Sequence, residues 1–465
     1  MCDGVSYSLP GIINSVILSS NSTNDDDDDI RATTAEASHI AAIPGLGAFL
    51  GIFFISVLVQ TIGRRLTYIF ILTLDLISWS ILPFARSVRA ILIARFLRGL
   101  GDGLFYNGIM ISEYADPKRR GYFSTIRKLF VGVGALVSHT MSIFMYTFRE
   151  ISIFAIVALL VAITLTFFWP ESPAFSAFKG RYDECKRNFL WLHGNSSEKQ
   201  DELVNMMGAQ MIRIEMKKKK KNNKIETVLK TLIKNDFLKA SLIVTILLML
   251  LDLCGRHYYL AFINQVFLMF FDDISIAGYC SIISDMLTIV SLIISSFVIY
   301  HFKRRTLVFF FGFLTTTLMF IISLAGFVKV EHSGLYLPWL EPVVMLLLNV
   351  VVNMGVVPVN LILTVEMYPL EQRGIGLCVA GLNLVIFTYL FGLKLTPIMI
   401  NNLGLHTTFG VFGVCIIICM VILYFILPET KDRTMQDIED KIRNVDSTII
   451  ELRPMIMKKM TSDAH

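Results

Sequence analysis

The chain has 465 residues, of which 54% are hydrophobic and 17% are charged, and its mean hydropathy is +0.64. A soluble domain carries about 25% charged residues, so this composition excludes an ordinary soluble protein and indicates a polytopic membrane protein. The formal net charge of +5 comes from short basic clusters between apolar segments, as in loops on the cytoplasmic face of a membrane. The lipid bilayer is therefore an expected partner, and nucleic acid is not.

Apolar segments long enough to cross a membrane follow one another along the chain. A helix needs about 20 residues to cross about 30 Å of hydrocarbon. The stretches that meet this requirement are 40–61, 66–84, 89–112, 121–146, 149–169, 238–262, 275–300, 306–327, 339–364, 374–398 and 406–427. Residues 4–20 are shorter and contain Pro10, so the first helix is expected to be truncated.

Basic residues orient these spans. If the spans alternate, Gly63-Arg64-Arg65, Lys118-Arg119-Arg120, Lys303-Arg304-Arg305 and the segment 170–236 fall on one side of the membrane. The positive-inside rule makes that side cytoplasmic. Asn21 begins the sequon Asn21-Ser22-Thr23 on the other side. Asn21 is therefore an expected glycosylation site, which would make the protein a glycoprotein.

Three short motifs occur twice in the same order. Gly63-Arg64-Arg65 corresponds to Lys303-Arg304-Arg305, the segment from Glu113 to Arg120 to that from Glu366 to Arg373, and Pro170-Glu171-Ser172 to Pro428-Glu429-Thr430. Three motifs at matching positions indicate a duplication of six helices. The expected fold is an all-α membrane protein with two six-helix bundles.

The domain boundaries follow from this duplication. We expect an N-terminal bundle at 1–169, a cytoplasmic linker at 170–236, a C-terminal bundle at 237–430 and a cytoplasmic tail at 431–465. In the linker, stretches 180–192 and 224–234 mix apolar and basic residues. Both stretches are expected to be short helices at the membrane interface.

The duplicated charges can form a network at the cytoplasmic helix ends. Its expected members are Arg64, Arg65, Glu113, Arg120, Glu171, Arg304, Arg305, Glu366, Arg373 and Glu429. Each pair is worth about 1 kcal/mol near the interface, but together they can bias two states that differ by a few kcal/mol. The alternative is that these charges only anchor helix ends against the lipid headgroups.

The sequence resembles the sugar porter family of the major facilitator superfamily, and in particular its insect trehalose transporter-like members. Besides the duplicated motifs, the residues that carry the resemblance are Ala94-Arg95-Phe96-Leu97 with Gly99 and Gly101, Ser112-Glu113-Tyr114-Ala115, Pro170 to Pro173, Glu366-Met367-Tyr368-Pro369 and Pro428 to Thr434. The resemblance implies a monomeric transporter that alternates access around a central site. It implies no enzymatic activity, no cofactor and no metal ion.

The resemblance weakens at the positions that would face a sugar. The family's Gln of the fifth helix falls on Lys128, beside Arg127, and its seventh-helix pattern falls on Leu251-Asp252 and Arg256-His257. The candidate cavity residues are Lys128, Arg127, Asp252, Arg256, His257, Asn360 and Asn383.

Two ion pairs are expected among the charges inside the spans. Arg98 and Asp102 are four residues apart on one helix and are expected to pair. Lys128 and Asp252 are expected to pair across the cavity, because an unpaired charge inside the membrane is costly. The alternative is that Lys128 and Asp252 turn to other partners, such as Asp102 or Asp285. The Gly99 and Gly101 positions are expected to allow close helix packing.

These observations favour a facilitative transporter of a sugar or a sugar-like small polar solute, as a multi-pass protein of the plasma membrane. One alternative is a sensor or degenerate paralogue that keeps the fold without transport, and another is a transporter of a charged solute. A membrane-embedded enzyme is not expected, because the sequence has neither a metal-ligand motif nor a nucleophile beside a base. Proton-coupled members of the family use a carboxylate of the first helix, where Asp3 is the candidate. Because that helix is truncated, Asp3 is not matched to this carboxylate and no coupling ion is expected.

Overall fold

A computed structural model of the chain describes residues 2–19, 33–102, 110–111, 113–115, 120–144, 147–197, 199–200, 203–204, 207, 232–271, 273–331, 337–368 and 373–431. The regular elements within these residues are helices. In the same part of the chain, eight helices are long and apolar enough to cross a membrane: His39–Thr61, Arg64–Phe84, Phe148–Phe167, Asn235–Leu268, Ser275–His301, Arg304–Lys329, Leu340–Glu366 and Ile375–Ile426.

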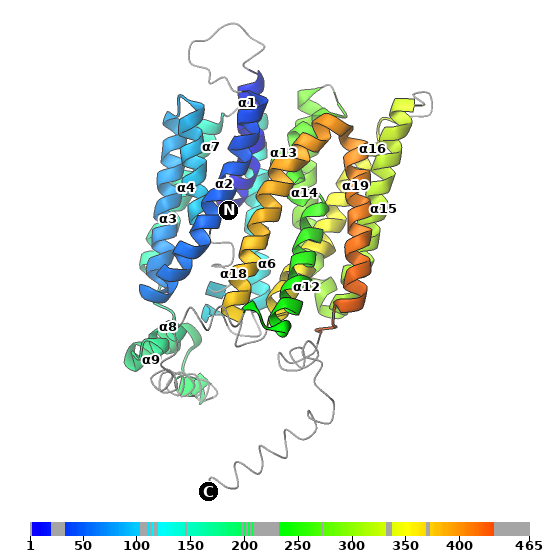
Figure 1. Cartoon of the computed structure of the whole chain (residues 1–465). Helices are drawn as coiled ribbons and strands as arrows, with labels where there is room; N and C mark the ends of the chain where they lie inside the picture. Colours follow the sequence, from blue (N-terminus) through cyan, green and yellow to red (C-terminus); the bar gives the residue numbers. More distant parts are fainter. Residues whose placement is uncertain are drawn as a thin grey trace.

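The expected spans reappear with a few differences. The two stretches 374–398 and 406–427 lie in one apolar helical segment, Ile375–Ile426, but the chain turns back between them near Gly404 (φ 81°), so that they remain two spans, as Figure 1 shows. The stretch 89–112 is helical to Gly101, and residues 103–109 lie outside the described part of the chain. The stretch 121–146 forms a helix from Arg120 to Ile143.

Two helical bundles stand side by side (Figure 1). The first contains α1 (Cys2–Ser19), α2 (Thr34–Thr61), α3 (Arg64–Ile81), α4 (Val88–Gly101), α6 (Arg120–Ile143) and α7 (Phe148–Phe167). The second contains α12 (Asn235–Leu253), α13 (Arg256–Leu268), α14 (Ile274–His301), α15 (Arg304–Glu331), α16 (Leu340–Val351), η3 (Val352–Val356), α17 (Val357–Glu366), α18 (Arg373–Val385), η4 (Ile386–Leu395) and α19 (Thr396–Ile426).

Among the described residues, three helices of the first bundle contact the second bundle. α1 contacts α13, α6 contacts α14, and α2 contacts both α18 and η4. The last contact is visible at the centre of Figure 1, where α2 in blue lies beside α18 in gold. Helices on the outer surface expose large apolar side chains such as Phe53, Val157 and Phe313, which suits contact with lipid.

Helix α1 is regular despite the proline that the sequence places within it. Pro10 lies inside the helix, and Val5, Leu9 and Ile12 are buried in the core of the first bundle. The residues expected to be a truncated segment therefore fold as an 18-residue helix between α6 and α13.

Helices α2 and α4 approach each other closely. A Cβ atom added to Gly47 would lie 2.3 Å from the carbonyl oxygen of Phe96, and one added to Gly99 would lie 2.0 Å from that of Pro44. A larger residue at either position would collide with the partner backbone. The expected packing role of Gly99 is therefore visible in the fold, and we call this contact the glycine seam.

Two short helices lie beneath the first bundle, near the start of α3. They are α8 (Pro173–Phe178) and α9 (Tyr182–His193), shown at the lower left of Figure 1. α9 falls at the expected interfacial stretch 180–192, whereas most of 224–234 lies outside the described residues. Cys185 is buried with Ala177 and Phe189, and this burial raises the pKa of its thiol to about 11, so the thiol stays neutral.

Candidate functional site

The two double-arginine motifs lie at the same end of the molecule, at the starts of α3 and α15. We call this end, defined by Arg64, Arg65, Arg304 and Arg305, the arginine end. The Arg64 guanidinium grips the Glu113 carboxylate with two hydrogen bonds of 2.7 and 2.8 Å. This two-pronged geometry is a strong form of ion pair.

The second bundle repeats this arrangement. Arg304 Nη1 lies 2.7 Å from Glu366 Oε2 and also donates to the Thr430 hydroxyl at 3.2 Å. Arg305 donates to the Tyr424 carbonyl at 2.7 Å, and Arg65 donates to the Phe167 carbonyl. The ion pairs Arg64–Glu113 and Arg304–Glu366 each lie within one bundle.

Among the described residues, Glu171 and Glu429 bond to backbone N–H groups and not to an arginine side chain, in contrast to the prediction. Glu171 Oε1 accepts from the backbone N–H of Arg64 at 2.8 Å, and Glu429 accepts from the backbone N–H groups of Arg304 and Arg305 at 3.1 Å each. The first N–H groups of a helix lack partners within the helix and carry partial positive charge. Both glutamates therefore cap the starts of α3 and α15.

Gly63 is required by this capping geometry. Its φ is +105°, a conformation that favours glycine, and a Cβ atom there would lie 2.5 Å from Glu171 Oε2. The side chains of Arg120 and Arg373, the other predicted members of the network, lie outside the described residues, as does Asn21.

The interior of the first bundle holds a second group of charges. Arg98 Nη2 lies 2.6 Å from Asp3 Oδ1, and Arg98 Nη1 lies 3.1 Å from Asp75 Oδ1. The predicted Arg98–Asp102 pair is wrong. Asp102 ends α4 with φ −73° and ψ 78°, so the chain has left the helix there. The Asp102 charge still acts on Arg98, but the two side chains form no salt bridge.

Arg95 connects three helices of the first bundle. It donates from Nη1 to the Ser6 carbonyl at 3.1 Å and from Nε to the Ile40 carbonyl at 3.3 Å. These are the carbonyls four residues before Pro10 and Pro44, which a proline leaves without a helical donor. A single guanidinium thus satisfies the backbone at two prolines, one in α1 and one in α2.

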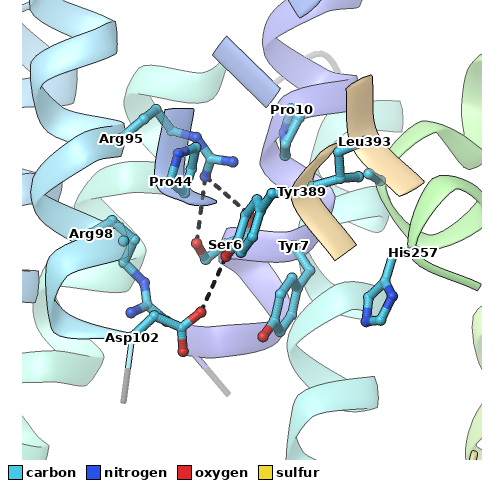
Figure 2. A pocket seen from close by; sticks show the side chains of 12 residues that line it. Ser6, Tyr7, Pro10, Pro44, Arg95, Arg98, Asp102, His257, Tyr389 and Leu393 are labelled. Carbon is cyan, nitrogen blue, oxygen red and sulfur yellow. Dashed lines mark hydrogen bonds between the residues drawn. The ribbon is translucent and has the colours of Figure 1, made fainter. Parts of the chain in front are cut away.

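Figure 2 shows Arg95 and Ser6 beside a small cavity of about 10 Å³ at the junction of the bundles. Tyr389, from η4, donates its hydroxyl to Asp102 Oδ2 at 3.2 Å across this junction. Tyr7 and His257 line the same cavity. The tyrosines were missed by the sequence reasoning, which searched for charges.

A larger cavity of about 150 Å³ lies between the bundles. Its lining comes from α1, α6, α13, α14 and the α16–η3–α17 segment. The predicted cavity residues Arg127, Lys128, Arg256 and His257 all line it. We call it the central cavity.

Asp252 bonds to a side chain of its own bundle and not to Lys128. Its carboxylate Oδ1 forms a short hydrogen bond with His257 Nδ1 of the same bundle, and the carboxylate is buried. The break between α12 and α13 at Gly255, which has φ 72°, brings these two side chains together. In the part of the chain described, the predicted Lys128–Asp252 pair does not form. Asp252 has another partner, as the alternative prediction allowed, although that partner is His257.

A second buried aspartate–histidine pair joins the two bundles. His139 Nδ1 of α6 lies 2.6 Å from Asp285 Oδ2 of α14, and both side chains are at most 5% exposed. His139 lies near the end of α6 opposite the arginine end. From the sequence, Asp285 was expected only as an alternative ion-pair partner, and His139 was not identified.

A polar network of hydroxyls and amides forms another wall of the central cavity. Asn349 Nδ2 donates to Thr288 Oγ1 at 2.7 Å and to Ser284 Oγ at 2.9 Å. The Tyr259 hydroxyl lies 2.8 Å from Ser284 Oγ, and Asn353 donates to Asn349 Oδ1 at 2.7 Å. The four-residue spacing of Asn349 and Asn353 inside an apolar stretch was the signal that could have revealed this wall.

The remaining predicted site residues lie elsewhere. Asn383 donates to Thr245 Oγ1 at 2.7 Å within the second bundle. Asn360 is 1% exposed, and neither atom of its amide has a hydrogen-bond partner among the described residues. Neither asparagine lines the central cavity.

Known proteins resemble this chain over most of its length. It is 23% identical over 432 residues to the facilitated trehalose transporter Tret1 of Aedes aegypti, covering 91% of this chain and 52% of that protein. It is 22% identical to the Tret1 of Culex quinquefasciatus, covering 91% and 81%. The chain thus spans about half of the Aedes relative.

Solved structures share the fold. The proton:xylose symporter XylE bound to 6-bromo-6-deoxy-D-glucose superposes with a TM-score of 0.75 at 17% identity, covering 94% of this chain and 96% of that one. The inward open form of XylE from E. coli gives a TM-score of 0.71. This similarity confirms the expected major facilitator fold. A family model described as sugar (and other) transporter matches residues 5–441, and the chain therefore belongs to that family.

Proposed function

We propose that this protein is a secondary transporter that carries a small polar solute, a sugar or a sugar-like molecule, by facilitated diffusion. The observation that carries the proposal is the central cavity, whose lining side chains come from both bundles. A solute held there touches both bundles, so a rocking motion of one bundle against the other changes the side from which the solute is reached. The family and the names of the relatives support the same function.

The arginine end is proposed to face the cytoplasm of a plasma-membrane protein that works as a monomer. Basic residues gather at this end, and cytoplasmic loops are rich in them. The segments 1–169 and 237–430 are proposed as the moving bundles, with 170–236 as the linker and 431–465 as the tail. The ion pairs Arg64–Glu113 and Arg304–Glu366 are proposed to stiffen each bundle at this end, and Asn21 is proposed to be glycosylated on the other side.

The experiment is uptake of a panel of labelled solutes into proteoliposomes that contain the purified protein. The panel includes trehalose, glucose and sugar derivatives of either charge. Saturable uptake above that of empty vesicles, competed by the unlabelled solute, supports transport. Uptake of the whole panel at the rate of empty vesicles would contradict it.

A sensor that binds without transporting is the second candidate. The observation that favours it is that Lys128 and Asp252 stand where the resemblance places sugar-binding amides. A sensor would be stabilised against heat by its solute while uptake stayed at the level of empty vesicles. No enzymatic reaction forms part of either proposal.

A further inference from the structure

One wall of the central cavity carries cations from both bundles. Arg127 and Lys128 belong to α6, and Arg256 is the first residue of α13. The charges of Arg256 and Arg127 both act on the Lys128 ammonium, so the three groups lie within electrostatic range of one another. Within the described residues, Lys128 and Arg256 form no hydrogen bond or salt bridge through their side chains.

The carboxylates near this wall already have partners. Asp285, the carboxylate among the lining residues, accepts from His139 at 2.6 Å. Asp252 bonds to His257, and Asp3 bonds to Arg98 at 2.6 Å and to Arg127 at 3.4 Å. Among the described residues, the protein therefore supplies Arg127 with a distant share of Asp3 and Arg256 with the charge of Asp252, whose hydrogen bond goes to His257, and it gives Lys128 no acid of its own.

Unneutralised charge inside a membrane protein is costly, and intramembrane cations usually pair or serve function. Lys128 and Arg256 face a solute cavity whose lining carboxylate, Asp285, is already bonded to His139, so the two cations attract a negative charge from the solute. A neutral sugar would leave both charges uncompensated when the cavity closes around it. The electrostatics of this wall thus favour an anionic solute.

The other wall suits hydroxyl groups. Asn349, Asn353 and Thr288 line it, with amide and hydroxyl groups linked to one another at 2.7 Å. The Tyr259 hydroxyl extends the same network. Amides and hydroxyls offer both donors and acceptors, which match the hydroxyls of a sugar ring.

We infer that the transported solute is a sugar acid, a hydroxylated ring that bears a carboxylate. The carboxylate faces Lys128 and Arg256, and the ring hydroxyls face Asn349 and Asn353. This inference rests on the proposed function and narrows its substrate class from polar solutes to organic anions. Lys128 is the residue that sets this specificity, because an amide is expected at its position in the family.

The test compares D-glucuronate with D-glucose, which differ in one carboxylate. In proteoliposomes, the unmodified protein should take up glucuronate with at least tenfold higher apparent affinity than glucose. Lys128→Gln should lower the apparent affinity for glucuronate about tenfold, the loss of one charge-assisted hydrogen bond, without lowering that for glucose. Arg256→Gln should act in the same direction. Lys394→Gln, which removes the same charge from a residue of η4 outside the cavity lining, should leave the ratio unchanged.

Two further measurements separate this inference from the proposed function. Melting temperatures without solute show whether each variant is folded. Glucose uptake equal to or better than glucuronate uptake, or an unchanged ratio in folded Lys128→Gln and Arg256→Gln, overturns the inference and leaves transport standing. If neither solute enters faster than into empty vesicles, the protein transports neither of them. Stabilisation of the protein against heat by each solute then shows whether it binds glucuronate. Stabilisation by glucuronate alone, lost in Lys128→Gln, supports the inference, and equal or absent stabilisation overturns it.

Discussion

Gly63 and Glu171 together determine how α3 begins. The positive φ of Gly63 turns the chain so that the backbone N–H groups of Arg64 and Arg65 point at the Glu171 carboxylate. A side chain at position 63 would meet both a strained backbone and the carboxylate oxygen at 2.5 Å.

Gly63→Ala should therefore lower the free energy of unfolding by more than the about 1–2 kcal/mol that a left-handed conformation costs a non-glycine residue. Gly180→Ala is the matched control, because Gly180 has φ +76° but no atom within 4 Å of the added Cβ. The control should show the conformational cost alone. Unfolding of both variants in detergent measures the difference, and equal losses would mean that crowding at Glu171 is unimportant.

Arg95 replaces two hydrogen bonds that prolines remove. Arg95→Met should leave the buried carbonyls of Ser6 and Ile40 without a donor and lower the stability by about 1–3 kcal/mol for each. Pro10→Ala restores an N–H group four residues after Ser6, so the loss caused by Arg95→Met should be smaller in a Pro10→Ala background. Melting temperatures of the four proteins form the cycle. Strictly additive losses would show that Arg95 stabilises α1 by other contacts.

At the scale of residues, sequence alone identified which side chains carry charge but not which of them meet. Arg127, Lys128, Arg256 and His257 line the central cavity as expected. Asp252 does not reach it, because the chain breaks at Gly255 and folds Asp252 onto His257. Spacing along an ideal helix cannot foresee such a break.

At the scale of helices, the two aspartate–histidine pairs differ in what they join. Asp285–His139 ties α14 to α6 of the other bundle, whereas Asp252–His257 stays between α12 and α13. Removing the charge at Asp285 should therefore loosen the bundles, and the same change at Asp252 should not.

Spin labels at Phe144 and Ile276, exposed residues near the facing ends of α6 and α14, report this loosening. Asp285→Asn should broaden or lengthen the distance distribution between the labels. Asp252→Asn serves as the matched control and should keep the distribution of the unmodified protein. An identical distribution in both variants would show that the Asp285–His139 pair does not hold the bundles together.

The positions of the helices were largely predictable because apolar runs of about 20 residues report burial in lipid directly. Their interruptions were not. The π-helical segments η3 and η4, the left-handed residue Gly255 and the bend at Gly404 leave the apolar composition unchanged, so hydropathy passes over them. Pro10 suggested an interruption that the helix does not have. Arg95 donates to the Ser6 carbonyl, which Pro10 leaves without a helical donor, and α1 continues through the proline.

At the scale of the whole molecule, the two ion pairs of the duplicated networks that the structure describes lie in separate bundles. Arg64–Glu113 belongs to the first and Arg304–Glu366 to the second. The sequence predicted their members through the internal repeat, but it could not tell pairs within a bundle from pairs between bundles, since topology places all of them at one end.

Glu113→Gln and Glu366→Gln should therefore destabilise the protein independently. Distant sites without shared partners add to within about 0.5 kcal/mol, so the double variant should lose the sum of the single losses. Glu113→Gln combined with Arg64→Gln should instead lose less than the sum, because both changes break one ion pair. A coupling of 1 kcal/mol or more between Glu113 and Glu366 would reveal a direct bridge between the bundles.

The glycine seam has a mechanical consequence. The backbones of α2 and α4 are in contact at Gly47 and Gly99, so neither helix can slide along the other without collision. The two helices therefore move as one rigid unit. A tilt of α2 at its contact with η4 therefore tilts α4 as well. Arg95 of α4 donates to the Ile40 carbonyl of α2, so this buried contact stays within the pair when the pair tilts.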